Sequence, residues 1–164
     1  MNSTLVAYFS ATGITAEAAS RLGRILNADL HEIKPAVPYS KADLNWMDPK
    51  SRSSVEMKDK NSRPEIAPES KVENMQSYKT VFLGFPIWWY TAPTVIRSFL
   101  EQYDFSGKTV ILFATSGSSG LGETARELQS SVSPDTVIKE LGMLNGHPDE
   151  KALKSRLDRL SIQY

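Results

Sequence analysis

The sequence predicts an α/β fold, a three-layer sandwich around a five-stranded parallel sheet of order 2-1-3-4-5. Nearly continuous apolar runs at 5–9, 80–85 and 109–114 are typical of strands covered on both faces. Two weaker runs, at 29–33 and 136–141, alternate between apolar and polar residues, which is typical of sheet edges. Since helical patterns separate the runs, the doubly wound order places the three apolar strands at the centre.

Helical periodicity fills the intervals between these strands. Residues 14–26 carry apolar side chains at helical spacing on one face. Three further helices are expected at 93–102, where Pro93 suits a first helical turn, at 122–132 and at 149–160.

One segment interrupts this alternation. Residues 34–79 separate the second strand from the third and contain five prolines and many charges. Because a structureless loop of this length is unusual in a compact domain, we expect an ordered excursion with a short helix near 41–46. The stretch 52–60 is too polar to assign. No repeat or shift in composition marks a second domain, so residues 1–164 are expected to form one domain.

Charge and composition exclude several kinds of function. Nineteen basic and nineteen acidic side chains give the 164 residues no net charge, which argues against binding to nucleic acid. The absence of cysteine rules out disulfides, thiolate metal sites and cysteine nucleophiles. The N-terminus lacks the basic region of a signal peptide, and no apolar run reaches membrane-spanning length. A cytoplasmic protein without membrane insertion is expected.

A loop of hydroxyl residues follows the first strand and opens the first helix. A helix N-terminus offers unpaired N–H groups and the positive end of the helix dipole, so this loop predicts a phosphate site. It has one glycine and no nearby lysine or arginine, unlike Walker or dinucleotide-binding loops, and a neutral cradle of this kind suits a monophosphate ester. The alternative is an ordinary N-capped turn. The expected binding residues are Ser10, Thr12, Gly13, Ile14 and Thr15.

An aromatic loop follows the third predicted strand, at the edge where open α/β sheets bind ligands. Large aromatic faces stack on planar heterocycles, so this loop predicts contact with a ring system. The alternative is that one or two of the rings only plug the sheet against the following helix. The candidate residues are Pro86, Ile87, Trp88, Trp89 and Tyr90.

Small residues follow the fourth predicted strand. Glycines and short hydroxyl side chains let a backbone approach a ligand closely, although a flexible surface turn would have the same composition. Because the loop lies at the same sheet edge as the other two, we favour a binding role. The candidate residues are Thr115, Ser116, Gly117, Ser118 and Gly120.

These motifs resemble the flavodoxin family. Residues 10–15 match the family's Thr/Ser-x-Thr-Gly-x-Thr phosphate loop, a Pro-x-Trp-Trp sequence follows the third strand, and the resemblance extends over residues 4–160. It implies non-covalent binding of flavin mononucleotide (FMN), used for one- or two-electron chemistry. It also implies that the aromatic loop borders the isoalloxazine ring and that the third loop meets the ring's polar edge.

Two departures from the family affect the flavin ring. No glycine lies between Phe85 and Phe105, so the peptide flip that stabilises a half-reduced flavin in many flavodoxins is in doubt. The third loop also lacks the tyrosine that usually covers the second ring face. Tyr39 or Trp46 is a candidate to cover that face, although Trp46 is better explained as a core anchor for the long segment. Otherwise the face is open to a nicotinamide or quinone.

Two functions follow from this resemblance. The favoured one is an oxidoreductase that passes electrons from a nicotinamide or other donor through FMN to a quinone or similar acceptor. The other is a non-enzymatic carrier that docks to redox proteins, although many such carriers are strongly acidic. No catalytic side chain or metal ligand is assigned, and both His31 and His147 are expected at the surface. A homodimer is compatible with the sequence but not specified by it.

Overall fold

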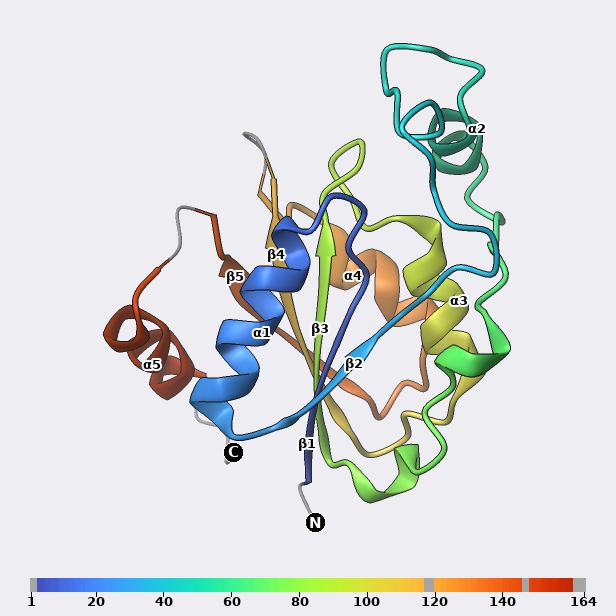
Figure 1. The fold of residues 1–164 in the computed structure, drawn as a ribbon. Coiled ribbons are helices and arrows are strands. Elements are labelled where there is room, and N and C mark those ends of the chain that lie inside the picture. The colour runs from blue at the N-terminus through green and yellow to red at the C-terminus, as the bar shows by residue number, and fades with distance from the viewer. Residues whose placement is uncertain (1–2, 117–119, 146–147, 161–164) are drawn as a thin grey trace.

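The sheet has the predicted topology. The computed structural model describes residues 3–116, 120–145 and 148–160. Its strands form a parallel sheet of order β2-β1-β3-β4-β5 (Figure 1). Their bounds are β1 (Thr4–Tyr8), β2 (Asp29–Glu32), β3 (Thr80–Pro86), β4 (Thr109–Thr115) and β5 (Val137–Met143). The predicted fold class is therefore confirmed, and the loops after β1, β3 and β4 leave the sheet at one edge.

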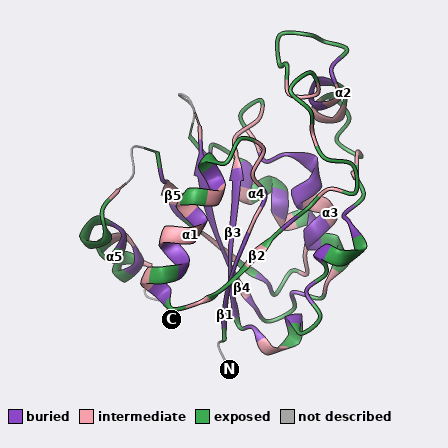
Figure 2. Cartoon of the chain, in the orientation of Figure 1, coloured by how far each residue is buried: buried purple, intermediate pink, exposed green. Residues whose placement is uncertain are grey.

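Burial along the strands follows the predicted division between centre and edge. In β3, residues 80–85 are all buried, and in β1 and β4 every residue but one is buried. By contrast, β2 is mostly exposed and β5 only partly covered. Figure 2 shows the buried residues gathered along the central strands and the helix sides that face them. The central strands were thus identified by their continuous apolar character.

Helices cover both faces of the sheet, as Figure 1 shows. The leucines of α1 (Ile14–Leu26) and α5 (Glu150–Arg159) pack with Val6, Phe82 and Phe113 on one face. On the other face, α3 (Thr94–Gln102) and α4 (Thr124–Leu128) pack against residues such as Leu83 and Leu112. The helix predicted at 122–132 is shorter in the structure, because α4 ends at Leu128 and passes into a 3-10 turn, η3 (Gln129–Ser131).

Close packing between two neighbouring strands requires glycine at one position. Gly84 of β3 pairs with Phe113 of β4, and a Cβ added to the glycine would lie 2.2 Å from Phe113 Cζ. No side chain fits in that space. Gly84 therefore gives the Phe113 ring room to lie across the sheet and join the core beneath α1 and α5.

The predicted helix at 41–46 is wrong. The backbone there forms successive turns, and the helix of this segment is α2 (Arg52–Lys58), in the stretch left unassigned. Short polar side chains explain the turns: the Ser40 and Asp43 side chains each accept a hydrogen bond from the other's backbone N–H, and Asn45 accepts one from Met47 N–H. Such bonds compete with helix formation. Ser51 instead caps α2 by accepting from Ser54 N–H.

Two stretches of the excursion, 34–36 at its start and 65–67 in its second half, lie side by side. Pro35 and Ile66 form an antiparallel bridge, Ala36 N–H donates to Glu65 O (2.8 Å), and Ala67 N–H donates to Lys34 O (2.8 Å). Two 3-10 turns, η1 (Pro68–Ser70) and η2 (Met75–Ser77), then lead to β3. The excursion thus leaves the sheet region and returns to it at nearly the same point.

Candidate functional site

The three predicted loops meet at Thr115, the last residue of β4. Its buried side-chain oxygen lies 2.8 Å from Thr15 Oγ1 at the start of α1, where either hydroxyl can donate. Its carbonyl oxygen accepts a hydrogen bond from Ile87 N–H (2.9 Å) in the aromatic loop. One residue of the third loop therefore ties the phosphate loop to the aromatic loop.

The first loop presents its backbone to solvent at the start of α1. Gly13 is the N-cap residue, with φ of 94°, and donates its N–H to Ser10 Oγ (3.0 Å). A Cβ at this position would have no atom within 4 Å, so there is room for a side chain. Glycine is favoured here because the backbone is left-handed. In the described structure no side chain caps this helix, and Thr12 and Ile14 are exposed. The N–H groups of the first turn are therefore not covered by a capping side chain, which favours the anion site over the ordinary N-capped turn.

Thr15 differs from the other hydroxyl residues of this loop. Its side chain is buried at 2% exposure and is engaged with Thr115, whereas Thr12 is exposed. The three predicted hydroxyls thus differ: Thr15 is buried against Thr115, Ser10 accepts from Gly13 N–H within the loop, and Thr12 is accessible.

The aromatic loop is a tight turn with an uncommon backbone. Trp88 N–H donates to Thr91 O (2.9 Å) and Thr91 N–H donates to Trp88 O (3.1 Å). The two residues between them, Trp89 and Tyr90, have φ of 49° and 66°, so both are left-handed, as in a type I′ turn. Glycine or asparagine normally occupies such positions, and a bulky residue there is strained by about 1–3 kcal/mol. A hydrogen bond to α4 also holds the loop, since Thr91 Oγ1 donates to Glu127 Oε2 (2.7 Å).

The three rings of this loop have different roles. Trp88 is half-buried and packs edge-to-face against Phe9 and Tyr39, with ring centroids 5.7 and 5.3 Å apart. Trp89 and Tyr90 are 43% and 78% exposed. One ring is therefore used in packing, against Phe9 and Tyr39 where the alternative named the following helix, and two rings are accessible to a ligand.

The third loop is fastened to the end of β5. Ser116 N–H donates to Asn145 Oδ1 (2.8 Å), and Asn145 Nδ2 donates to Ser116 O. Gly120 is exposed, while Gly117 and Ser118 lie outside the described residues. Sequence reasoning missed Asn145; its signal was a polar amide two residues after the fifth strand, at the same sheet edge.

Tyr39, not Trp46, anchors the excursion. Trp46 is 71% exposed, so its interpretation as a core anchor is wrong. Tyr39 packs against Phe9 (5.6 Å between ring centroids) and donates its hydroxyl to Glu56 Oε1. Arg52 lies 3.8 Å from the Tyr39 ring centre and donates to Glu56 Oε2 (2.9 Å). Burial, followed by the bond to Glu56, raises the pKa of Tyr39 far above its usual range, so its hydroxyl stays protonated.

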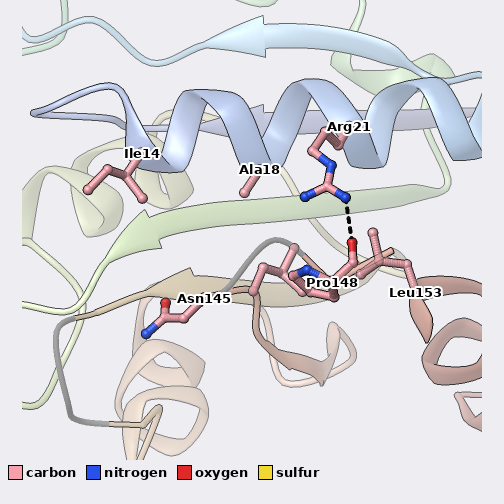
Figure 3. A pocket seen from close by; sticks show the side chains of 7 residues that line it. Ile14, Ala18, Arg21, Asn145, Pro148 and Leu153 are labelled. Carbon is pink, nitrogen blue, oxygen red and sulfur yellow. Dashed lines mark hydrogen bonds between the residues drawn. The ribbon is translucent and has the colours of Figure 1, made fainter. Parts of the chain in front are cut away.

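Cavities border the first loop, the aromatic turn and the start of α1. One of about 320 Å³ is bordered by Ser10, Ala11 and Tyr39, and another of about 450 Å³ lies between the excursion and the aromatic turn. A third, of about 40 Å³, lies between α1 and the region after β5, where Arg21 donates to Pro148 O (2.6 Å) (Figure 3). Arg21 borders this space, which is far below the roughly 300–1,000 Å³ of a small-molecule site.

Other predicted features are resolved as follows. In the described residues no group of three or more histidine, aspartate or glutamate side chains is placed to hold a metal. Within the same residues, no helix has both the length and the apolar character needed to cross a bilayer. His31 is half-buried, not at the surface, and donates through Nε2 to Ser70 O (2.9 Å). His147 lies outside the described residues.

Comparison with known proteins gives strong matches. The family model described as "Flavodoxin" matches residues 3–160. A crystal structure of a "putative flavoprotein" from Bacteroides eggerthii is 49% identical over 98% of each chain, with a TM-score of 0.91. Another from Bacteroides uniformis is 45% identical over 94% of this chain and 97% of that one, with a TM-score of 0.84.

A more distant structure shares the fold alone. It is a flavoprotein from Lactobacillus acidophilus in complex with FMN, 20% identical over 85% of this chain and 91% of that one, with a TM-score of 0.63. No curated protein sequence matches this chain.

Proposed function

The chain belongs to the flavodoxin family, and from that premise we propose that it binds FMN and acts as an oxidoreductase. Electrons pass from a nicotinamide or other donor, through the flavin, to a quinone or similar acceptor. The observation that carries this proposal is the meeting of the three loops at Thr115, which brings the uncapped start of α1 and two accessible aromatic rings to one sheet edge.

The described residues fit the two ends of FMN. The start of α1 offers backbone N–H groups and the exposed Thr12 hydroxyl to a phosphate, with no carboxylate in the loop to repel it. Trp89 and Tyr90 offer apolar ring faces to the isoalloxazine. FMN, when bound, supplies the reversible uptake of one or two electrons, and the protein contributes position and electrostatic environment.

Each loop has a separate task in this proposal. The first holds the phosphate, the aromatic turn limits the ring on one side, and the third loop brings backbone groups to the ring's polar edge. Thr115 sets the spacing between them, because its side chain and carbonyl oxygen each contact a different loop. No side-chain acid or base is needed for hydride transfer to a flavin, which agrees with the lack of an assigned catalytic residue.

The balance of charge supports an enzyme over a carrier. Carriers that dock to protein partners commonly use a charged surface to steer the encounter, and this chain has equal numbers of acidic and basic residues. The third loop also has no aromatic residue to close the second ring face against a small substrate. A carrier remains the second function, and turnover separates it from the first.

The experiment has two stages. Protein purified from cells, or incubated with FMN, is expected to show flavin absorbance in the visible range and to release FMN on denaturation. Reduction by NADH or NADPH is then followed with a quinone present. Steady turnover supports the enzyme, whereas a flavin-loaded protein that no nicotinamide reduces favours the carrier. A colourless protein that fails to take up FMN would refute the proposal.

A further inference from the structure

The cavity between the excursion and the aromatic turn has an aromatic, uncharged lining. It measures about 450 Å³, and its walls come from Leu44, Trp46 and Ser53 on one side and residues 87–90 on the other. No lysine, arginine, aspartate or glutamate is among these described residues. Its size lies in the range of small-molecule sites, and its lining favours an apolar, uncharged ring over a phosphate-bearing ligand.

Trp46 has no structural task that explains its position. The excursion is held by Tyr39, Arg52 and Glu56, while the Trp46 side chain is 71% exposed at the cavity wall. Leaving a large aromatic side chain in water gives up favourable burial, and clustered exposed apolar residues commonly mark binding sites. Tyr90, across the cavity, is similarly exposed at 78%.

A hydroxyl group beside this cavity also lacks a partner. Ser53 is buried at 2% exposure, and among the described residues its Oγ has no hydrogen-bond partner. Buried hydroxyls are normally hydrogen-bonded, so this one keeps unused bonding capacity next to the cavity, although the Oγ atom itself is closed to solvent.

The cavity lies on the far side of the aromatic turn from the phosphate loop. None of the described residues of the first and third loops lines it. In Figure 1, α2 stands to the right of the end of β3, whereas the start of α1 and the end of β4 lie to its left. A ligand in this cavity would share Trp88, Trp89 and Tyr90 with the flavin without occupying the phosphate end of its site.

We propose that this cavity binds a planar, uncharged quinone between Trp46 and the aromatic turn. The binding can be measured without the flavin, but the role as electron acceptor rests on the proposed function. FMN, if bound in its reduced form, would supply the two electrons that convert a quinone in this cavity to the hydroquinone, with the two protons coming from the flavin and water.

The test is calorimetric titration of the protein with menadione, an uncharged naphthoquinone, with and without saturating FMN. The chain has no cysteine, so a thiol adduct cannot mimic binding. Trp46→Ala is expected to weaken menadione binding by about tenfold, since it removes one stacking face. Met47→Ala is the matched control, because Met47 is 70% exposed and adjacent but does not line the cavity, and it should bind menadione as the parent does.

The affinity for FMN shows whether the cavity is separate from the flavin site. We expect the parent and Trp46→Ala to bind FMN equally well, and FMN and menadione to bind at the same time. Equal menadione affinity in all three proteins would overturn the proposal, and so would competition between menadione and FMN, since the cavity would then be the flavin's own ring site. If no variant binds FMN, the proposed function fails, and the menadione titrations without FMN still decide the cavity.

Discussion

Replacing Thr15 with valine removes one member of a buried hydroxyl pair whose oxygens lie 2.8 Å apart. Valine has nearly the shape of threonine, and the two side chains are only 2% and 5% exposed, so the main effect is to leave Thr115 Oγ1 unpaired in a closed site. An unsatisfied buried hydroxyl costs about 1–3 kcal/mol of unfolding free energy. For a chain of this length, that lowers Tm by about 2–12 °C.

The double variant Thr15→Val/Thr115→Val gives the decisive comparison. Removing both hydroxyls leaves no unsatisfied group, so it should recover most of the stability lost in either single variant. The assay is urea unfolding of the flavin-free protein, followed by far-UV circular dichroism. Thr12→Val is the control, since its exposed hydroxyl should change the unfolding free energy by less than about 0.5 kcal/mol. Losses that simply add in the double variant would refute the coupling between the first and third loops.

Three further predictions test other features. Thr12→Ala should raise the FMN dissociation constant about tenfold in a calorimetric titration, because a hydroxyl–phosphate bond is lost, with an unchanged urea midpoint; unchanged affinity would remove Thr12 from the phosphate site. Gly84→Ala should destabilise the protein to urea by about 1–3 kcal/mol or more through collision with Phe113, whereas Gly120→Ala, with open space at its Cβ, should not. Burial lowers the pKa of His31, so the folded protein binds fewer protons there than the unfolded chain. The contribution of His31 to the unfolding free energy is therefore fully present above its unfolded pKa of about 6.5, and it is lost as the pH falls from there to the lower folded pKa. In the His31→Gln variant, the urea midpoint should fall less over this pH range.

The sheet was predictable because its signal is local. Central strands buried on both faces must be apolar throughout, and β1, β3 and β4 are. The three loops were predictable for the same reason, since parallel strands bring their carboxyl ends to one edge. What each hydroxyl contacts was not predictable: Thr12 and Thr15 look equivalent in the sequence, but only Thr15 faces β4.

The excursion was poorly predicted for two reasons: side-chain bonds to the backbone replace a helix with turns, and the packing of its rings depends on residues outside the segment. The 41–46 stretch has helix-compatible residues, yet bonds from Ser40 and Asp43 side chains to the backbone give turns instead. Trp46 resembles a core residue by size alone. Its exposure follows from Tyr39 occupying the place against Phe9 that an anchor would take, and no local sequence signal distinguishes the two rings.

The backbone pairing at 34–36 and 65–67 bears on how this chain can vary. Because residues 34–36 and 65–67 pair with each other, the length of the segment between them is not set by the geometry of the sheet. Replacing residues 37–64 with a short turn would leave every strand connection intact. A change at Tyr39 within this segment would act differently, because its ring packs against Phe9, next to Ser10, and against Trp88. Variation in length and variation at Tyr39 therefore have separate consequences for this edge of the sheet.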